Sequence, residues 1–260
     1  MCMLKLLLSL SFFSSLLVHY TFAYTIYDTT WSSANGGDGS YFEIHSDALT
    51  WSDAKTAAAQ LTKSGYSDGH LAEIRSLELQ NFIWTWIDGL ITNGDLKTYD
   101  GVTWPVPTND IVPVAEDGGF ASYIWLGGSD SGTERTWQWS SNDETFYVEG
   151  NSNNSDYVNW GAGSGVTEPD NFPDGTNEDG FAGQDGLAMA LQGWWNVDGS
   201  STGAIGNAGQ WNDVGTANEL FYLVQFSPVP ELAQTPLIII LALSIGITHA
   251  RSRRRNFLQD

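Results

Sequence analysis

Cysteine and basic residues are both scarce in this sequence. The chain has 260 residues and one cysteine, Cys2, so disulfide bonds, thiol catalysis and thiolate metal sites are excluded from residues 24–230. In the same range five Lys and Arg stand against 29 Asp and Glu, a formal excess of 24 negative charges. Since phosphate binding needs clustered Lys and Arg, this balance excludes nucleic acid as a partner.

The first 23 residues have the layout of a secretory signal peptide. Lys5 precedes an apolar run from Leu6 to Val18, and Thr21-Phe22-Ala23 ends the segment with a small residue. We therefore expect residues 1–23 to be removed and the exported chain to begin near Tyr24.

The C-terminal residues 228–260 have the pattern of a membrane or sorting tail. The motif Val229-Pro230-Glu231-Leu232 precedes an apolar run over residues 237–247, and arginines stand at positions 251, 253, 254 and 255. Positive residues stay on the cytoplasmic side of a membrane, which places residues 24–230 outside. The tail resembles the PEP-CTERM sorting signal of Gram-negative bacteria, although that family has proline where Leu232 stands. The resemblance implies a bacterial cell-envelope protein, membrane-anchored until an exosortase-like enzyme processes the tail.

Hydrophobic periodicity predicts an α+β domain between these two ends. Apolar positions recur at helical spacing over residues 51–63 and again after Ser76, and Thr50 suits a helix N-cap. Strands are predicted at residues 40–46, 122–127, 136–139, 186–191 and 220–226. Residues 24–39 are a lead-in, and turn-forming residues predict a surface insertion at 88–120 and a long loop region at 150–186.

Short motifs between residues 40 and 227 follow one another in the order of a C-type lectin-like domain. They are Trp51 with Ala54, residues 69–74, residues 76–82, Trp125-Leu126-Gly127-Gly128, Trp137 with Trp139, Tyr157 with Asn159-Trp160, Glu168-Pro169-Asp170 and Trp211-Asn212-Asp213. The resemblance implies an α+β fold with two helices, short antiparallel strands and a long calcium-binding-type loop. Ala58 stands where that family has its first cysteine, so this cysteine-free variant must depend on its aromatic core.

The long loop is rich in carboxylates. Six of them lie within residues 168–185, without a single Lys or Arg between them. Unneutralised carboxylates repel one another, and Ca²⁺ relieves such repulsion because it takes about 6 to 8 oxygen ligands from flexible loops. These residue types suit Ca²⁺ rather than zinc. An EF-hand loop that began at Asp170 would have Phe172 at its third position, where a ligand is needed, so an EF-hand is excluded.

The resemblance implies a particular set of ligands. Glu168 and Asp170 flank a proline that is cis in the family, and Asn212 and Asp213 complete the calcium shell from the next strand, where we expect them at a loop edge. In such lectins the same four residues hold the sugar through the ion. Carbohydrate or exopolysaccharide is therefore the expected partner, and Ca²⁺ the expected cofactor.

A Glu-Asp pair before the buried strand supplies further ligands in the family, and two positions here fit it. The spacing from Glu168 favours Glu178 with Asp179, whereas adjacency to the strand at 186–191 favours Asp185. We prefer Glu178 as the ligand. Glu168-Pro169-Asp170 is a hybrid of the mannose-type and galactose-type motifs, so it does not fix the sugar.

Two other functions are consistent with the same residues. The domain could be a calcium-free module that binds a protein or matrix partner at the cell surface, with the acidic loop serving only solubility. A hydrolase with Glu168 and Glu178 as its acid and base is a more distant alternative. We expect a binding protein rather than an enzyme.

Overall fold

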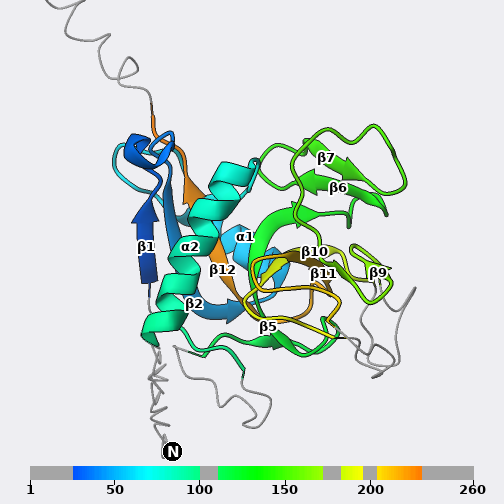
Figure 1. Cartoon of the computed structure of the whole chain (residues 1–260). Helices are drawn as coiled ribbons and strands as arrows, with labels where there is room; N and C mark the ends of the chain where they lie inside the picture. The colour runs from blue at the N-terminus through cyan, green and yellow to red at the C-terminus, as the bar shows by residue number, and fades with distance from the viewer. Residues whose placement is uncertain (1–25, 100–110, 172–182, 196–203, 230–260) are drawn as a thin grey trace, which may run out of the picture.

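The computed structural model describes residues 26–99, 111–171, 183–195 and 204–229 (Figure 1). Two α-helices and mostly antiparallel strands make up this part of the chain, which confirms the expected α+β class. The helices are α1 (Trp51–Gln60), α2 (Leu77–Asn93) and the short 3₁₀ helix η1 (Ser33–Asn35). The strands are β1 (Ile26–Thr30), β2 (Tyr41–Leu49), β3 (His70–Leu71), β4 (Val114–Ala115), β5 (Ala121–Ser129), β6 (Thr136–Trp139), β7 (Thr145–Val148), β8 (Ala162–Gly163), β9 (Val166–Thr167), β10 (Gly186–Ala190), β11 (Trp211–Val214) and β12 (Leu220–Phe226).

The main sheet has the order β1-β2-β12-β5-β10-β11. Its neighbours pair antiparallel, apart from β12 and β5, which run parallel. The hairpin β6–β7 extends from β5, and β8–β9 form a separate pair. Strands β10 and β11 thus form one end of the sheet, opposite β1, with the long loops beside them (Figure 1).

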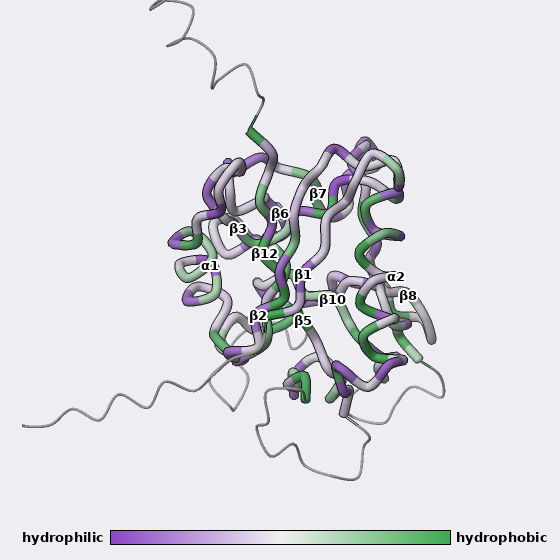
Figure 2. Tube along the Cα trace, turned by 90° about the vertical axis from the view of Figure 1, so that its left-hand side faces the viewer, coloured by the Kyte–Doolittle hydropathy of each residue, from purple (hydrophilic) through white to green (hydrophobic). Residues whose placement is uncertain are grey.

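The two helices cover opposite faces of the sheet, as two perpendicular views show (Figure 1 and Figure 2). Ile83 of α2 belongs to one buried cluster, and Trp51 of α1 belongs to another. Strand β12 serves both, because Phe221 lies in the first cluster and Tyr222 in the second. Successive side chains of a strand point to opposite faces, so a strand covered on both sides is apolar nearly throughout.

Both helices begin close to the predicted positions. The Thr50 hydroxyl accepts a hydrogen bond from Asp53 N at 3.3 Å, and the Ser76 hydroxyl accepts one from Leu79 N at 3.2 Å. Helix α1 ends at Gln60, earlier than the predicted residue 63, because Leu61 is already extended. Helix α2 continues to Gly94, whose φ of 80° is the left-handed cap that glycine tolerates.

Part of the segment 88–120, expected as a surface insertion, belongs to the core. Residues 88–93 are the last turns of α2, and β4 pairs with β5. Leu96, Val112 and Ala115 are at most 1% exposed. The turn-forming residues around these apolar positions concealed them in the sequence. Residues 100–110 lie outside the described part of the chain.

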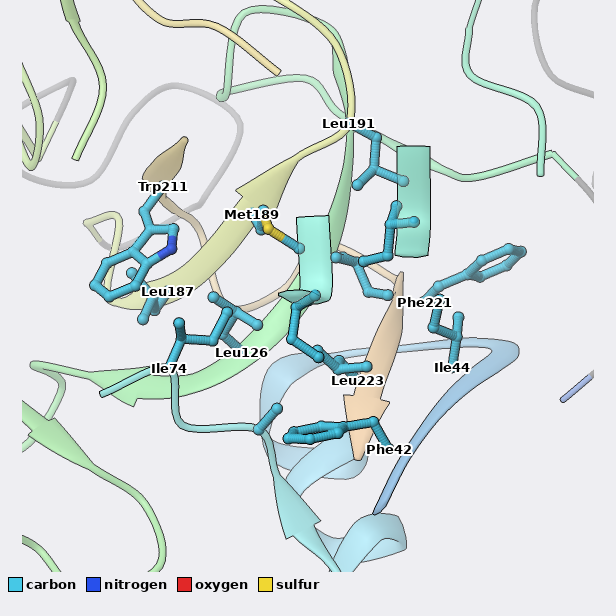
Figure 3. Packing of buried hydrophobic residues seen from close by; sticks show 14 of the residues in the cluster. Phe42, Ile44, Ile74, Leu126, Leu187, Met189, Leu191, Trp211, Phe221 and Leu223 are labelled. Carbon is cyan, nitrogen blue, oxygen red and sulfur yellow. The ribbon is translucent and has the colours of Figure 1, made fainter. Parts of the chain in front are cut away.

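Aromatic side chains fill the core, as expected for a domain without cysteine. The largest fully buried side chains are Trp125, Trp137, Trp139, Trp194 and Trp211. Trp139 stacks on Phe146 with ring centroids 4.0 Å apart, and it meets Trp211 edge to face at 6.3 Å. Figure 3 shows Trp211 beside Leu187 in this cluster. Trp211 is thus a core residue, and it anchors the strand that carries Asn212 and Asp213.

Candidate functional site

The loop that carries Glu168 and Asp170 follows β9 and is joined to β11. Glu168 N donates to Gly161 O at 2.9 Å, and Gly161 N donates to Trp211 O at 2.9 Å. The Glu168–Pro169 peptide bond is cis, as the C-type lectin resemblance implies. Glu168 is only 4% exposed, whereas Asp170 is exposed. The loop therefore offers one buried and one accessible carboxylate on either side of the proline.

Asn212 and Asp213 lie within β11 rather than at a loop edge. The two side chains are 3% and 0% exposed, and β11 is paired to β10. Asp213 Oδ1 accepts from Asp170 N at 3.3 Å, and Oδ2 accepts from Asn171 N at 2.7 Å. The loop-edge expectation is wrong, because the strand register places both residues inside. Through these two hydrogen bonds Asp213 holds the loop at residues 170–171 against the sheet.

Three of the expected ligands meet in space. Glu168, Asp170 and Asp213 each offer a carboxylate oxygen, and these oxygens lie within 4.8 Å of one another. At such separations like charges repel strongly, and more so where protein replaces water. The group can relieve that repulsion by taking up protons or a cation.

Burial makes this group costly to ionise. It raises the pKa of Glu168 to about 8, an effect to which the charge of Asp170 adds and which the hydrogen bond from Trp194 opposes. Burial also raises the pKa of Asp213 well above its ordinary value, and the charge of Glu168 adds to the effect. Because both shifts disfavour the ionised form, a bound divalent cation is the physical condition under which the carboxylates ionise together.

Hydrogen bonds fix the orientation of the Asn212 amide. The Tyr123 hydroxyl donates to Gly118 O at 2.7 Å, so it accepts the hydrogen bond from Asn212 Nδ2 at 3.0 Å. A hydroxyl has one proton, which is already used. The amide nitrogen is thereby held against Tyr123, and Oδ1 is the end of the amide with acceptor capacity for a ligand.

A cavity of about 20 Å³ adjoins the carboxylates; we call it the acidic cavity. Its polar lining includes Asp117, Glu168, Asp170 and Asn212, with no Lys or Arg among the described lining residues. The volume exceeds the roughly 10–15 Å³ that one water needs. Glu168 Oε1 accepts a hydrogen bond from Trp194 Nε1 at 3.3 Å, while its buried Oε2 has no hydrogen-bond partner in the described part of the chain. The donor set and the space therefore fit a single cation.

Of the remaining expected ligands, the structure describes only Asp185. Glu178 and Asp179 lie outside the described residues. Asp185 is half-buried beside a second acidic group, where burial and the charge of Glu134 raise its pKa. The structure thus places Asp185 apart from the three carboxylates of the acidic cavity.

This second acidic group was not found from the sequence. Burial raises the pKa of Asp130 to about 7, and the charges of Glu134, Asp185 and Glu149 add to it. Asn171 links the two groups, because its Nδ2 donates to Glu134 Oε1 at 2.9 Å while its backbone N donates to Asp213. The sequence signal was the four-residue spacing of Asp130 and Glu134 in the turn after β5.

Asp117 is the other polar residue that sequence reasoning missed. Its carboxylate accepts from Gly215 N at 2.7 Å and Asn218 Nδ2 at 2.8 Å, and its backbone O accepts from Gln184 Nε2 at 2.9 Å. Burial raises its pKa, and these donors lower it. Asp117 therefore joins the segment before β5 to the turn after β11, at the wall of the acidic cavity.

Comparison with known proteins finds likeness in structure rather than in sequence. No protein-family model matches the chain, and no curated protein matches it. Solved C-type lectin domains resemble this structure. The mouse scavenger receptor C-type lectin carbohydrate-recognition domain is 20% identical with a TM-score of 0.41, covering 75% of this chain and 92% of that one. The C-type lectin CEL-I from Cucumaria echinata is 15% identical with a TM-score of 0.41, covering 74% and 93%.

The cow C-type carbohydrate-recognition domain of CD23 is a further similar structure, 18% identical with a TM-score of 0.39, covering 74% of this chain and 89% of that one. At these identities the likeness concerns the fold alone. No helix among the described residues is long and apolar enough to cross a membrane. The apolar tail at 237–247 lies outside them.

Proposed function

We propose that this protein binds carbohydrate through Ca²⁺ held by Glu168, Asp170, Asn212 and Asp213. The observation that carries the proposal is the meeting of three carboxylate oxygens within 4.8 Å. Carboxylate and amide oxygens are the ligands that Ca²⁺ prefers, and the absence of thiol and imidazole donors from this set disfavours zinc. The buried, unpaired Oε2 of Glu168 supports the same conclusion, since an unpaired buried acceptor is costly.

The residues have different tasks in this proposal. Bound Ca²⁺ supplies coordination positions for sugar hydroxyl oxygens. Glu168 and Asp170 accept hydrogen bonds from the hydroxyl protons. The hydrogen bond to Tyr123 orients the Asn212 amide so that its Oδ1 can coordinate the ion. Asp213 already accepts two backbone N–H groups, so it both contributes charge and holds the loop. Binding that needs the ion and directed hydrogen bonds is selective for hydroxyl geometry.

Glu178 is proposed as a further ligand, with Asp179 as a less favoured one. Both lie in the sequence between Asp170 and β10. Asp185 is the alternative to this pair, and it lies with Asp130 and Glu134 rather than among the three clustered carboxylates.

The pattern of residues 1–23, typical of a secretory signal, supports a site of action outside the cytoplasm. We propose that the protein is exported and acts at the cell surface or in the extracellular matrix, binding carbohydrate or exopolysaccharide. The tail at 228–260 is proposed to hold it at the membrane until an exosortase-like enzyme acts. No catalytic role is proposed for Glu168, because its carboxylate is assigned to the ion.

A glycan array tests the proposal directly. The purified protein should bind one class of glycan in millimolar Ca²⁺, lose it in EDTA and regain it when Ca²⁺ is restored. Mg²⁺ serves as the matched ion, since it requires shorter, near-octahedral coordination and should not replace Ca²⁺. Glycan binding that is equal in Ca²⁺ and EDTA would contradict the calcium role. Binding to proteins but to no glycan would favour the calcium-free interaction module.

A further inference from the structure

A larger open cavity lies next to the acidic cavity; we call it the aromatic cavity. It has a volume of about 490 Å³, and its lining includes Tyr99, Phe120 and Trp195 together with the polar Thr98 and Gln192. Ligand cavities in proteins typically measure about 300–1,000 Å³ and combine apolar walls with a few polar groups. Its size and lining therefore suit a small amphipathic ligand.

Two of its aromatic side chains are open to solvent. Phe120 is 37% and Trp195 is 53% exposed, and they are the two aromatics among the large hydrophobic side chains exposed in the described chain. Exposed apolar surface that gathers around one cavity indicates a contact site rather than core packing. Gln192 Oε1, in the same lining, is buried and without a hydrogen-bond partner in the described residues. A ligand hydroxyl could donate to it.

The backbone at Phe120 supports a role for its ring. Its φ of 55° lies in the left-handed region, which is sterically unfavourable for a bulky residue and which glycine or asparagine adopts more readily. The turn itself therefore does not require phenylalanine. Because the side chain is 37% exposed, burial does not explain its presence either. A ligand that packs on the ring would explain it.

The aromatic cavity adjoins the acidic cavity. Gly119 and Trp195 line both. A Cβ on Gly119 would lie 2.3 Å from Trp195 O, so the two turns touch and only glycine fits between them. The neighbouring Trp194 is buried and donates to Glu168 Oε1, whereas Trp195 is exposed. Any ligand longer than one unit at the acidic cavity can thus extend over Trp195.

We propose that the aromatic cavity is a second subsite for the next sugar unit of an oligosaccharide whose first unit binds the Ca²⁺ proposed for the acidic cavity. This inference rests on the proposed function. A pyranose ring has one face of C–H groups and a rim of hydroxyls. The C–H face packs on Trp195 and Phe120, and a rim hydroxyl donates to Gln192 Oε1. The occupant is a neutral oligosaccharide, since no Lys or Arg lines the cavity among the described residues.

The test compares chain lengths in two probe series, one of mannose, mannobiose and mannotriose and one of galactose, galactobiose and galactotriose. Affinities are measured by calorimetry in Ca²⁺ for the full-length protein and its variants. The disaccharide of the preferred series should bind more tightly than its monosaccharide. Phe120→Asn should reduce that gain by about tenfold and leave the monosaccharide affinity unchanged, and Trp195→Ala should also reduce the gain. Leu77→Ala is the matched control, because Leu77 is an equally exposed hydrophobic residue, at 54%, on α2.

Thermal unfolding separates ligand binding from a structural role. Phe120→Asn should keep or raise the melting temperature, since asparagine tolerates the left-handed backbone. A clear fall in melting temperature, with the chain-length gain retained, would overturn the inference. Monosaccharide binding without any gain for longer chains would also overturn it while leaving the acidic cavity intact. Failure of every sugar to bind in Ca²⁺ would instead contradict the proposed function, and the subsite with it.

Discussion

Without bound Ca²⁺, the stability of this protein should fall as the pH rises. Glu168 has a pKa of about 8 in the folded, metal-free protein, against an ordinary value of 4.5. Between these two values the folded state keeps a proton that the unfolded chain has lost, so raising the pH favours unfolding. The buried carboxyl of Asp213 acts in the same direction, since its pKa is also raised.

The size of the effect follows from Glu168. The difference between about 8 and 4.5, at about 1.4 kcal/mol per pH unit, corresponds to on the order of 5 kcal/mol lost between pH 4.5 and pH 8. For a domain of roughly 200 residues this lowers the melting temperature by about 10 °C or more. If Ca²⁺ binds as proposed, it should replace the proton and restore stability, by about 2.7 kcal/mol when its concentration is 100 times the dissociation constant.

Thermal unfolding followed by circular dichroism at pH 5, 6, 7 and 8 measures this, in EDTA and in Ca²⁺. Glu168→Gln has nearly the same shape as the protonated carboxyl group and cannot ionise. This variant should be more stable than the wild type in EDTA at pH 8, and Ca²⁺ should not stabilise it. The reasoning is refuted if the metal-free wild type is as stable at pH 8 as at pH 5, or if Glu168→Gln unfolds at a lower temperature than the wild type in EDTA at pH 8.

Three further predictions concern the site, the core and the tail. Asn212→Ala should abolish calcium-dependent sugar binding with little change in circular dichroism. Tyr123→Phe, which releases the Asn212 amide, should weaken the affinity for Ca²⁺ about tenfold in a calcium titration. Unchanged affinity in both variants would place the ligands elsewhere. Trp139→Ala, at a residue 1% exposed, should cost about 3–5 kcal/mol in urea unfolding, and a loss below about 1 kcal/mol would contradict the aromatic core. Cell fractionation should find the protein with the membrane while residues 228–260 are present, and a freely soluble, untruncated form would refute the tail assignment.

Local sequence patterns predicted the main elements because each carried its own periodicity or cap. The alternation around Phe42 and Ile44 marked β2, and the apolar stripe after Ser76 marked α2. Strand β1 was missed, since as an edge strand it is half exposed and has no apolar face of its own. The buried positions within 88–120 were missed although they are apolar, because only a few of them stand among many turn-forming residues.

The candidate site was only partly predictable. The resemblance grouped Glu168 and Asp170 with Asp213, and the structure brings these three together. Burial of Asn212 and Asp213 depends on the pairing of β11 with β10, which local spacing does not reveal. The second acidic group depends on the pairing of β10 with β5, which brings Asp185 next to Asp130 across more than fifty residues of sequence. Tertiary pairing of this kind leaves no periodic signal.

Direct calcium titration by isothermal calorimetry tests the central claim most directly. The wild type, freed of metal at neutral pH, should bind Ca²⁺ with release of a proton, because Glu168, with a pKa of about 8, is protonated before the ion enters. Glu168→Gln should lose this binding, whereas Asp88→Asn, at an exposed acid on α2, should keep it. The account is contradicted if the wild type takes up no Ca²⁺, or if Glu168→Gln binds it as tightly as the wild type does.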